Sequence, residues 1–157
     1  MPSEHERTGG GRGGPWTPRS PVEQEEDRAL GLRGEELVYR AELKRVDTLG
    51  YPEARVVWTS KSNPAADHDI LSVADDGGDL WLEVKSTTGR HGRFDWPRAE
   101  FELALRARER YVLCRVYEAH TTRPTVRREQ DPVAKLLAGA MRLDISSLAA
   151  EVAPLPT

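Results

Sequence analysis

The stretch that most constrains the fold is LWLEVKSTTG, residues 80–89, because its first half follows the period-two pattern of a β-strand. Alternation leaves only leucine and valine on one face and puts Trp81, Glu83 and Lys85 on the other. A carboxylate and an ammonium therefore stand side by side on a strand that is otherwise apolar. They face either water or a ligand that needs a negative and a positive group together.

Hydrophobic periodicity along the rest of the chain predicts helices and strands in a definite order. The predicted elements are a helix over 34–50, strands over 54–61, 68–73 and 80–86, a helix over 96–110 with Pro97 in its first turn, strands over 111–119 and 124–129, and a helix over 131–141. The turn ADDGG joins the strands on either side of it into a hairpin. This order predicts a mixed α/β domain with one central sheet.

Composition predicts three segments in the chain of 157 residues. Residues 1–28 are rich in Gly, Pro and charge, bury too little apolar surface to order themselves and are expected to form a disordered tail. Residues 29–150 are long enough for one domain without disulfides or structural metals, and 151–157 are expected to be a flexible C-terminus. The single cysteine, Cys114, and the absence of a signal or membrane-spanning pattern predict a cytoplasmic protein with no membrane contact.

Charge argues against one broad class of function. The net charge of −3 does not suit a protein that holds nucleic acid by bulk positive charge, although a local basic patch is compatible with it. The chain has 19 arginines and 4 lysines. Because this sequence usually supplies a cation as arginine, the lysine at position 85 indicates that a compact amine is needed there.

Two carboxylates and an amine are predicted to meet at one edge of the sheet. Asp69 begins one strand of the hairpin, Glu83 and Lys85 lie on the other, and adjacent strands bring such positions within side-chain reach. Carboxylate oxygens suit Mg²⁺ or Mn²⁺, and a neighbouring lysine can orient a water or stabilise charge on a phosphate. The alternative is a solvated Glu–Lys ladder on a structural domain, worth about 0–1 kcal/mol. The residues alone leave both interpretations open.

Motifs along the chain add a resemblance to known families. HDILSV and LEVKS, with 14 residues from Asp69 to Glu83, resemble the PD-(D/E)XK nuclease superfamily, whose restriction-endonuclease-like core runs αβββαβ around a mixed sheet. More narrowly, the chain resembles the protein NO VEIN C-terminal domain family over about residues 31–148. The blocks that carry this resemblance are GLRGEELV, DHDILSV, LWLEVKSTTG, FDWPRAEFELA, RYVLCRVYE and DPVAKLL. Both resemblances imply a central mixed sheet flanked by helices.

The resemblance implies a role for each matching residue. Asp69 and Glu83 match the metal ligands, the carbonyl of Val84 is the expected third ligand, and Lys85 matches the catalytic lysine. Glu35 matches an acidic residue that some members of the superfamily add to the catalytic set. Alternatively, Glu35 is a first-turn glutamate favoured by the helix dipole.

Glu100, Ser86 and Asp67 are three further residues expected close to these positions. Glu100 shares the helix face that packs on the sheet, so it is expected to orient the site by reaching Lys85 or Ser86; its alternative role is that of an N-terminal helix glutamate. The family usually has a glycine where this chain has Asp67. That residue either adds negative charge to the site or caps the turn after SNPAA.

The loop GRHGRFDWPR, residues 89–98, follows the Glu–Lys strand and is rich in cations. Its Arg90, Arg93 and Arg98 are predicted to contact nucleic-acid phosphates. The alternative is a solvated loop whose aromatic residues, Phe94 and Trp96, pack against the next helix. The residues do not decide between the two.

Together these expectations predict a function and an alternative. The predicted function is a metal-dependent nuclease that hydrolyses phosphodiester bonds in nucleic acid, with DNA as the expected substrate, Mg²⁺ or Mn²⁺ as cofactor, and defence or restriction as the setting that the superfamily suggests. Because the chain is anionic, a protein partner or a second copy in a homodimer is expected to help hold the substrate. The alternative is a non-catalytic binding or scaffolding module of a larger assembly.

Overall fold

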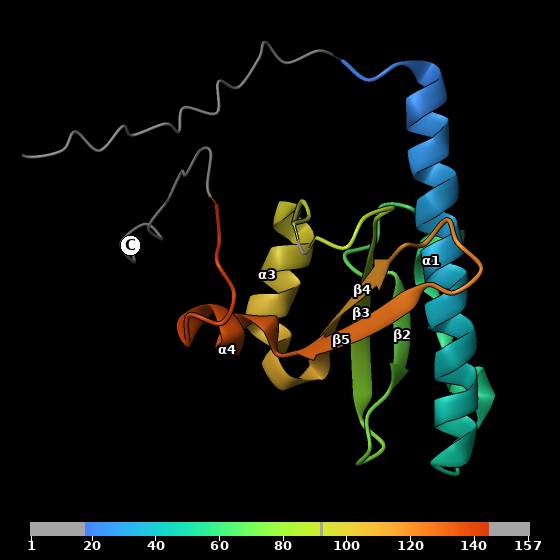
Figure 1. Cartoon of the computed structure of the whole chain (residues 1–157). Coiled ribbons are helices and arrows are strands. Elements are labelled where there is room, and N and C mark those ends of the chain that lie inside the picture. Colours follow the sequence, from blue (N-terminus) through green and yellow to red (C-terminus); the bar gives the residue numbers. More distant parts are fainter. Residues whose placement is uncertain (1–17, 92, 145–157) are drawn as a thin grey trace, which may run out of the picture.

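The computed structural model describes residues 18–91 and 93–144, which form one five-stranded sheet with helices on both of its faces (Figure 1). The strands lie in the order β1-β2-β3-β4-β5. Strands β3 and β4 run parallel, and the other neighbouring pairs are antiparallel. The predicted α/β class is confirmed, and the arrangement is compatible with a restriction-endonuclease-like core.

The alternating stretch of the sequence forms the central strand of this sheet. Strand β3 (Asp79–Ser86) pairs with β2 (Ile70–Val73) on one side and with β4 (Tyr111–Tyr117) on the other. The edge strands are β1 (Val57–Trp58) and β5 (Thr125–Gln130). Because β3 and β4 are parallel, the chain crosses over between them, and this crossover carries the helix α3.

Helix α1 (Pro21–Thr48) covers one face of the sheet (Figure 1). The buried side chains of Val38 and Val46 pack in one apolar cluster with the leucine and valine face of β3. Of the helices that the structure describes, none is both long and apolar enough to cross a membrane.

The start of α1 corrects the predicted limit of the tail. A helix that begins at Gly34 after a disordered segment up to residue 28 is wrong, because α1 already begins at Pro21. A capping box closes this end: Ser20 Oγ accepts a hydrogen bond from the Glu23 N–H, and Glu23 accepts one from the Ser20 N–H. This signal is present in the sequence SPVE. The predicted tail up to residue 17 and the C-terminus over 151–157 lie outside the described residues.

Helices α3 (Arg98–Ala107) and α4 (Pro132–Leu137) cover the other face of the sheet (Figure 1). Leu103 of α3 and Val133 of α4 pack there in a second apolar cluster with Leu113 of β4. Both faces of β4 are therefore buried, as the apolar sequence of this strand requires.

The limits of β1, α3 and α4 also differ from the predicted ones. Strand β1 is short because only the first two residues of β2 pair with it, and it lies between a 3₁₀ turn (Glu53–Arg55) and the helical turn α2 (Thr59–Ser62). Pro97 is the N-cap of α3 rather than part of its first turn. Helix α4 ends at Leu137, and Gly139 then adopts a left-handed conformation with φ of 74°.

Candidate functional site

Asp69 lies immediately before β2, and both its backbone and its side chain form hydrogen bonds with β3. The Asp69 N–H donates to the Leu82 carbonyl at 3.0 Å, and Asp69 Oδ2 accepts from the Val84 N–H at 2.8 Å. Ile70 pairs with Leu82 in an antiparallel register. The residue before Ile70, Asp69, therefore lies opposite the residue after Leu82, Glu83. The backbone therefore fixes the Asp69 carboxylate beside β3.

Glu83 and Lys85 lie on the face of β3 that α3 covers, and Glu100 reaches them from the first turn of α3. The Lys85 Nζ atom is 2.8 Å from Glu83 Oε1 and 2.6 Å from Glu100 Oε2. Glu83 is only 3% exposed, and the Lys85 side chain is 18% exposed. A solvated Glu–Lys ladder does not describe this arrangement, because the ion pairs are shielded from water.

The acidic charge in this cluster exceeds what Lys85 neutralises. Burial, and next the charge of Glu35, raise the pKa of Asp69 to about 6. Burial, and next the charge of Asp69, raise the pKa of Glu83 to about 9. Burial by itself would lower the pKa of Lys85, but Glu83 and Glu100 outweigh it and raise that pKa. Lys85 therefore stays charged, and the carboxylates still favour one more positive charge, a proton or a metal ion.

Glu35 comes to this cluster from α1. It accepts hydrogen bonds from Trp58 Nε1 at 2.7 Å and from Ser60 Oγ at 2.5 Å. Because α1 begins at Pro21, Glu35 lies well inside the helix, and the interpretation as a first-turn glutamate is wrong. The sequence pattern does not single out Trp58 and Ser60 as its partners.

Ser86 lies on the opposite face of β3 from Lys85, against α1. Its Oγ is buried with no hydrogen-bond partner among the described residues, and a Cβ built on Gly34 would come within 1.9 Å of it. Glu100 therefore does not reach Ser86, and that part of the prediction is wrong because strand alternation separates the two faces. Glu100 contacts Lys85 instead.

Asp67 does not cap the turn that precedes the site. Its Oδ1 is 2.8 Å from His68 Nδ1, and its Oδ2 is 3.9 Å from an Arg106 nitrogen. The turn is capped by Asn63, whose Oδ1 accepts from the Ala65 N–H at 3.2 Å. The predicted cap is wrong, because a side chain earlier in the turn already fills that role.

The donor set suits a hard cation that takes few protein ligands. In residues 18–91 and 93–144, no group of three or more His, Cys, Asp or Glu side chains is placed to hold a metal ion. Mg²⁺ needs only one or two carboxylates, because waters and phosphate oxygens complete its octahedron. Asp69 and Glu83 supply that number, and burial together with neighbouring carboxylates raises their pKa values, so a bound cation would favour their ionised forms. The Val84 carbonyl stays a predicted ligand.

The arginines predicted to contact phosphates lie on the surface, each in an ion pair. The pairs are Arg90–Glu118 at 2.9 Å, Arg93–Asp144 at 3.3 Å and Arg98–Glu102 at 2.7 Å. The three arginine side chains are 80%, 85% and 90% exposed. Exposed pairs of this kind contribute little to stability, so they can exchange for other anions at small cost.

A family model described as Protein NO VEIN, C-terminal matches residues 34–128 of the chain. The chain belongs to the protein NO VEIN C-terminal family. In this NO VEIN C-terminal domain, the matched range starts at Gly34, which packs against β3, and includes the cluster of Asp69, Glu83 and Lys85. No curated protein and no solved structure matches the chain. The chemistry of the NO VEIN C-terminal domain must therefore be inferred from its geometry.

Proposed function

We propose that this NO VEIN C-terminal domain is a metal-dependent nuclease of the PD-(D/E)XK type. Its reaction would be the hydrolysis of phosphodiester bonds in nucleic acid, with DNA as the expected substrate. The observation that carries the proposal is the meeting of Asp69, just before β2, with Glu83 and Lys85 of β3, in a buried cluster whose carboxylates outnumber its one amine. Such clusters of shifted acids beside a fixed amine are typical of catalytic sites.

Asp69 and Glu83 are the residues that would hold Mg²⁺ or Mn²⁺. When bound, the ion would polarise a phosphoryl oxygen and lower the pKa of a coordinated water. The hydrogen bond from the Val84 N–H holds Asp69 Oδ2, so the other carboxylate oxygen, Oδ1, would be the one to bind the ion. Glu83 is held in place by Lys85, so both acids are positioned before any ligand arrives.

Lys85 would act as a fixed cation rather than as a base. Its pKa is raised, because Glu83 and Glu100 outweigh the opposing effect of burial, so the amine keeps its proton near neutral pH. In this state Nζ can donate a hydrogen bond to the attacking water or to a phosphate oxygen on which negative charge develops. Glu100 would serve as a positioning residue, since its carboxylate lies 2.6 Å from Nζ.

The net charge of −3 means that the substrate must be held by local cations or with the help of another chain. The proposal therefore includes the loop arginines, a protein partner or a second copy of the domain, and a cytoplasmic setting such as defence or restriction. A non-catalytic module would bind nucleic acid or metal without cleavage, and the test below separates that case.

Cleavage of a panel of single-stranded and double-stranded DNA and RNA, with and without Mg²⁺ or Mn²⁺, tests the proposal. The intact chain should cleave at least one substrate only when metal is present. Lys85→Ala should abolish cleavage but keep the metal-dependent rise in melting temperature, whereas Asp69→Asn should lose that rise. Lys44→Ala, at an exposed position of α1, is the matched control and should cleave like the parent chain.

Two results would contradict this proposal. Equal cleavage by Lys85→Ala would assign the activity to a contaminant. Metal binding that depends on Asp69, with no cleavage of any substrate, would favour the non-catalytic module.

A further inference from the structure

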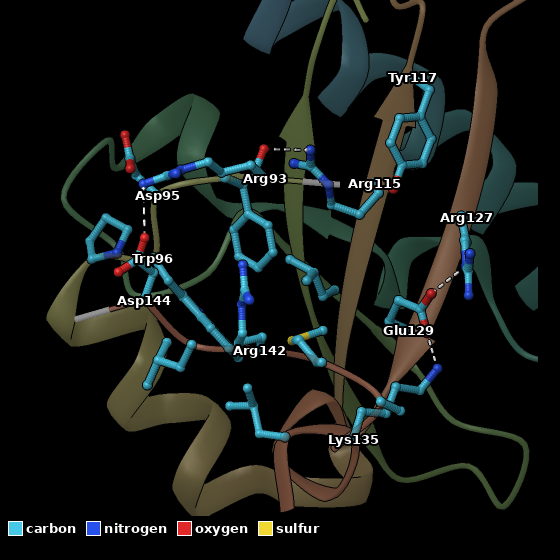
Figure 2. A pocket seen from close by; sticks show the side chains of 17 residues that line it. Arg93, Asp95, Trp96, Arg115, Tyr117, Arg127, Glu129, Lys135, Arg142 and Asp144 are labelled. Atoms are coloured by element: carbon cyan, nitrogen blue, oxygen red, sulfur yellow. Dashed lines mark hydrogen bonds and ion pairs between the residues drawn. The ribbon is translucent and has the colours of Figure 1, made fainter. Parts of the chain in front are cut away.

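A cavity of about 800 Å³ lies on the face of the sheet that α3 and α4 cover, over β4 and β5 (Figure 2). Its apolar lining includes Leu113 of β4 and Met141 after α4, with Phe94 and Trp96 from the loop before α3. The cluster of Asp69, Glu83 and Lys85 does not line it, so the cavity is a separate feature of the molecule.

The cavity nevertheless adjoins the candidate site through the sheet. Leu113 and Arg115 line it from β4, and in the parallel register they are the partners of Glu83 and Lys85 on β3. All four side chains lie on the same face of the sheet, because paired positions of neighbouring strands project to the same side. The cavity is therefore one strand away from the proposed catalytic lysine.

Arg115 puts a buried positive charge in the wall of the cavity. The residue is 3% exposed, and its guanidinium donates to the carbonyls of Lys85 at 3.0 Å and Arg93 at 3.1 Å (Figure 2). It lies 4.9 Å from the ring centroid of Phe94 and 5.5 Å from that of Tyr117. Among the described residues it has no carboxylate partner within 4.0 Å, so an anion in the cavity would offset a charge that is costly to bury alone.

Arg142 adds a second cation without a described carboxylate partner. It is exposed on the segment after α4, and its side chain extends into the cavity (Figure 2). The other cations of the lining have carboxylate partners: Arg127 and Lys135 share Glu129, and Arg93 contacts Asp144. With Asp95 included, five cations and three carboxylates line the cavity, so its lining has an excess of positive charge. Arg115 and Arg142 are the two lining cations without a carboxylate partner among the described residues.

Two aromatic rings, inclined at 54° to each other, lie beside these cations. The rings of Phe94 and Trp96 have centroids 5.6 Å apart, and Trp96 is held edge-on by Phe101 at 5.0 Å. Trp96 also lies 6.3 Å from Tyr111 of β4, which anchors it to the sheet. An immobilised aromatic surface next to arginine groups is the combination that binds a base by stacking and its phosphate by charge.

We propose that this cavity binds a nucleoside phosphate, with the base against Phe94 and Trp96 and the phosphate near Arg115 and Arg142. The ligand is either a free mononucleotide or one nucleotide of a nucleic-acid strand. Its assignment as part of the substrate strand rests on the proposed nuclease function, because the cavity would then hold a nucleotide near the bond to be cut. Binding itself requires neither the metal nor the acidic cluster.

Calorimetric titration of the Lys85→Ala chain in EDTA tests this proposal without cleavage. The probes are a deoxynucleoside monophosphate, a short single-stranded oligonucleotide, inorganic phosphate and a poly-glutamate peptide. The two nucleotide probes should bind more tightly than phosphate alone, because only they stack on the aromatic rings. Arg142→Gln should weaken their binding by roughly tenfold or more. Arg123→Gln, at an exposed position outside the cavity lining, should leave it unchanged.

The nuclear magnetic resonance signal of the Trp96 indole N–H locates the bound probe. A shift of this signal by the mononucleotide indicates a free nucleotide as ligand, and a shift by the oligonucleotide alone indicates a nucleotide within a strand; both support the proposal. It is overturned if neither nucleotide shifts this signal, if Arg142→Gln binds as tightly as its parent, or if poly-glutamate is preferred. If no nucleotide binds in the cavity but the chain still cleaves nucleic acid with metal, only the cavity proposal is refuted. If nucleotides bind there but no substrate is cleaved, only the nuclease proposal is refuted.

Discussion

Asp69 and Glu83 are held by folding in positions where an ionised carboxylate is costly. The pKa of Glu83 rises from the ordinary 4.5 to about 9, and that of Asp69 rises from 3.8 to about 6, chiefly because both are buried. A folded protein retains such residues when another requirement outweighs the cost. At the scale of single residues, this is the strongest physical sign that the cluster serves a ligand.

Replacement of Glu83 by glutamine should flatten the pH dependence of stability. The folded chain keeps a proton on Glu83 up to about pH 9, whereas the unfolded chain loses it near 4.5. Between these values unfolding releases a proton, so the free energy of unfolding falls as pH rises, by at most about 1.4 kcal/mol per pH unit for each proton. Urea denaturation in EDTA, from about pH 5 to about pH 9, measures the slope for the parent chain and Glu83→Gln.

Glu36→Gln is the control for this experiment, because Glu36 lies on the exposed side of α1 in a surface pair with Arg40. Its slope should match that of the parent chain. Parallel curves for the parent chain and Glu83→Gln would show that Glu83 is ionised in the folded state and would contradict the raised pKa.

The positions of Asp69, Glu83 and Lys85 could be predicted, because strand alternation and hairpin register follow from a local pattern of two residues. The partners of Glu35 could not. Trp58 and Ser60 are held against Glu35 by the packing of α1 on the sheet, which no local pattern records. Residue types determine which ligands a site can bind. Contacts between segments distant in the sequence determine which side chains meet at the site.

At the scale of elements, the contact of α1 with β3 depends on the glycine that opens the matched family range. Replacement of Gly34 by alanine would put a Cβ 1.9 Å from Ser86 Oγ and 3.2 Å from Ser86 Cβ. We expect Gly34→Ala to lower the free energy of unfolding by about 1–3 kcal/mol, as overpacking does. Addition of Ser86→Ala should restore most of this loss, because it removes the closer atom. Urea denaturation of the two single variants and the double variant measures the coupling.

Gly31→Ala is the matched control, since Gly31 lies in the same helix and a Cβ there would meet no atom within 4 Å. It should stabilise the chain slightly, because alanine favours a helix more than glycine does. Ser86→Ala alone should be close to neutral, because its buried hydroxyl has no described partner to lose. If Gly34→Ala lowers the free energy of unfolding equally in the parent chain and in the Ser86→Ala chain, the contact is disproved.

The limits of the elements were harder to predict than their order. The apolar pattern locates the part of α1 that packs on the sheet, but the exposed residues 21–29 extend beyond it, and the capping box stabilises their end. The apolar pattern also does not account for the burial of the acid Glu42 in α1. This residue is 1% exposed, and it accepts a hydrogen bond from Ser72 Oγ at 2.6 Å and pairs with Arg128, so α1 is joined to β2 and β5. A buried acid is tolerated here because it is paired: Arg45 of the same helix lies 2.8 Å away, in addition to the partners from β2 and β5.

At the scale of the whole molecule, the two sides of the sheet carry different chemistry. The α1 side is joined by the internal Glu42 pairs, whereas the side of α3 and α4 has the cavity with Arg115 and Arg142. Arg93, from the loop before α3, lies on that second side, where it lines the cavity. In a chain with a net charge of −3, this distribution makes the side of α3 and α4 the expected face for a polyanion.

Salt dependence of nucleic-acid binding tests this assignment for the whole molecule. In the cleavage-deficient Lys85→Ala chain, without metal, Arg90→Gln and Arg93→Gln together should reduce the slope of log affinity against log salt concentration. The expected reduction is about one for each phosphate that the variant no longer neutralises, because each neutralised phosphate releases about one counterion. Arg28→Gln together with Arg40→Gln removes the same charge from exposed positions of α1 and should leave the slope unchanged. An equal reduction in both double variants would mean that net charge, rather than the face of α3 and α4, holds the nucleic acid.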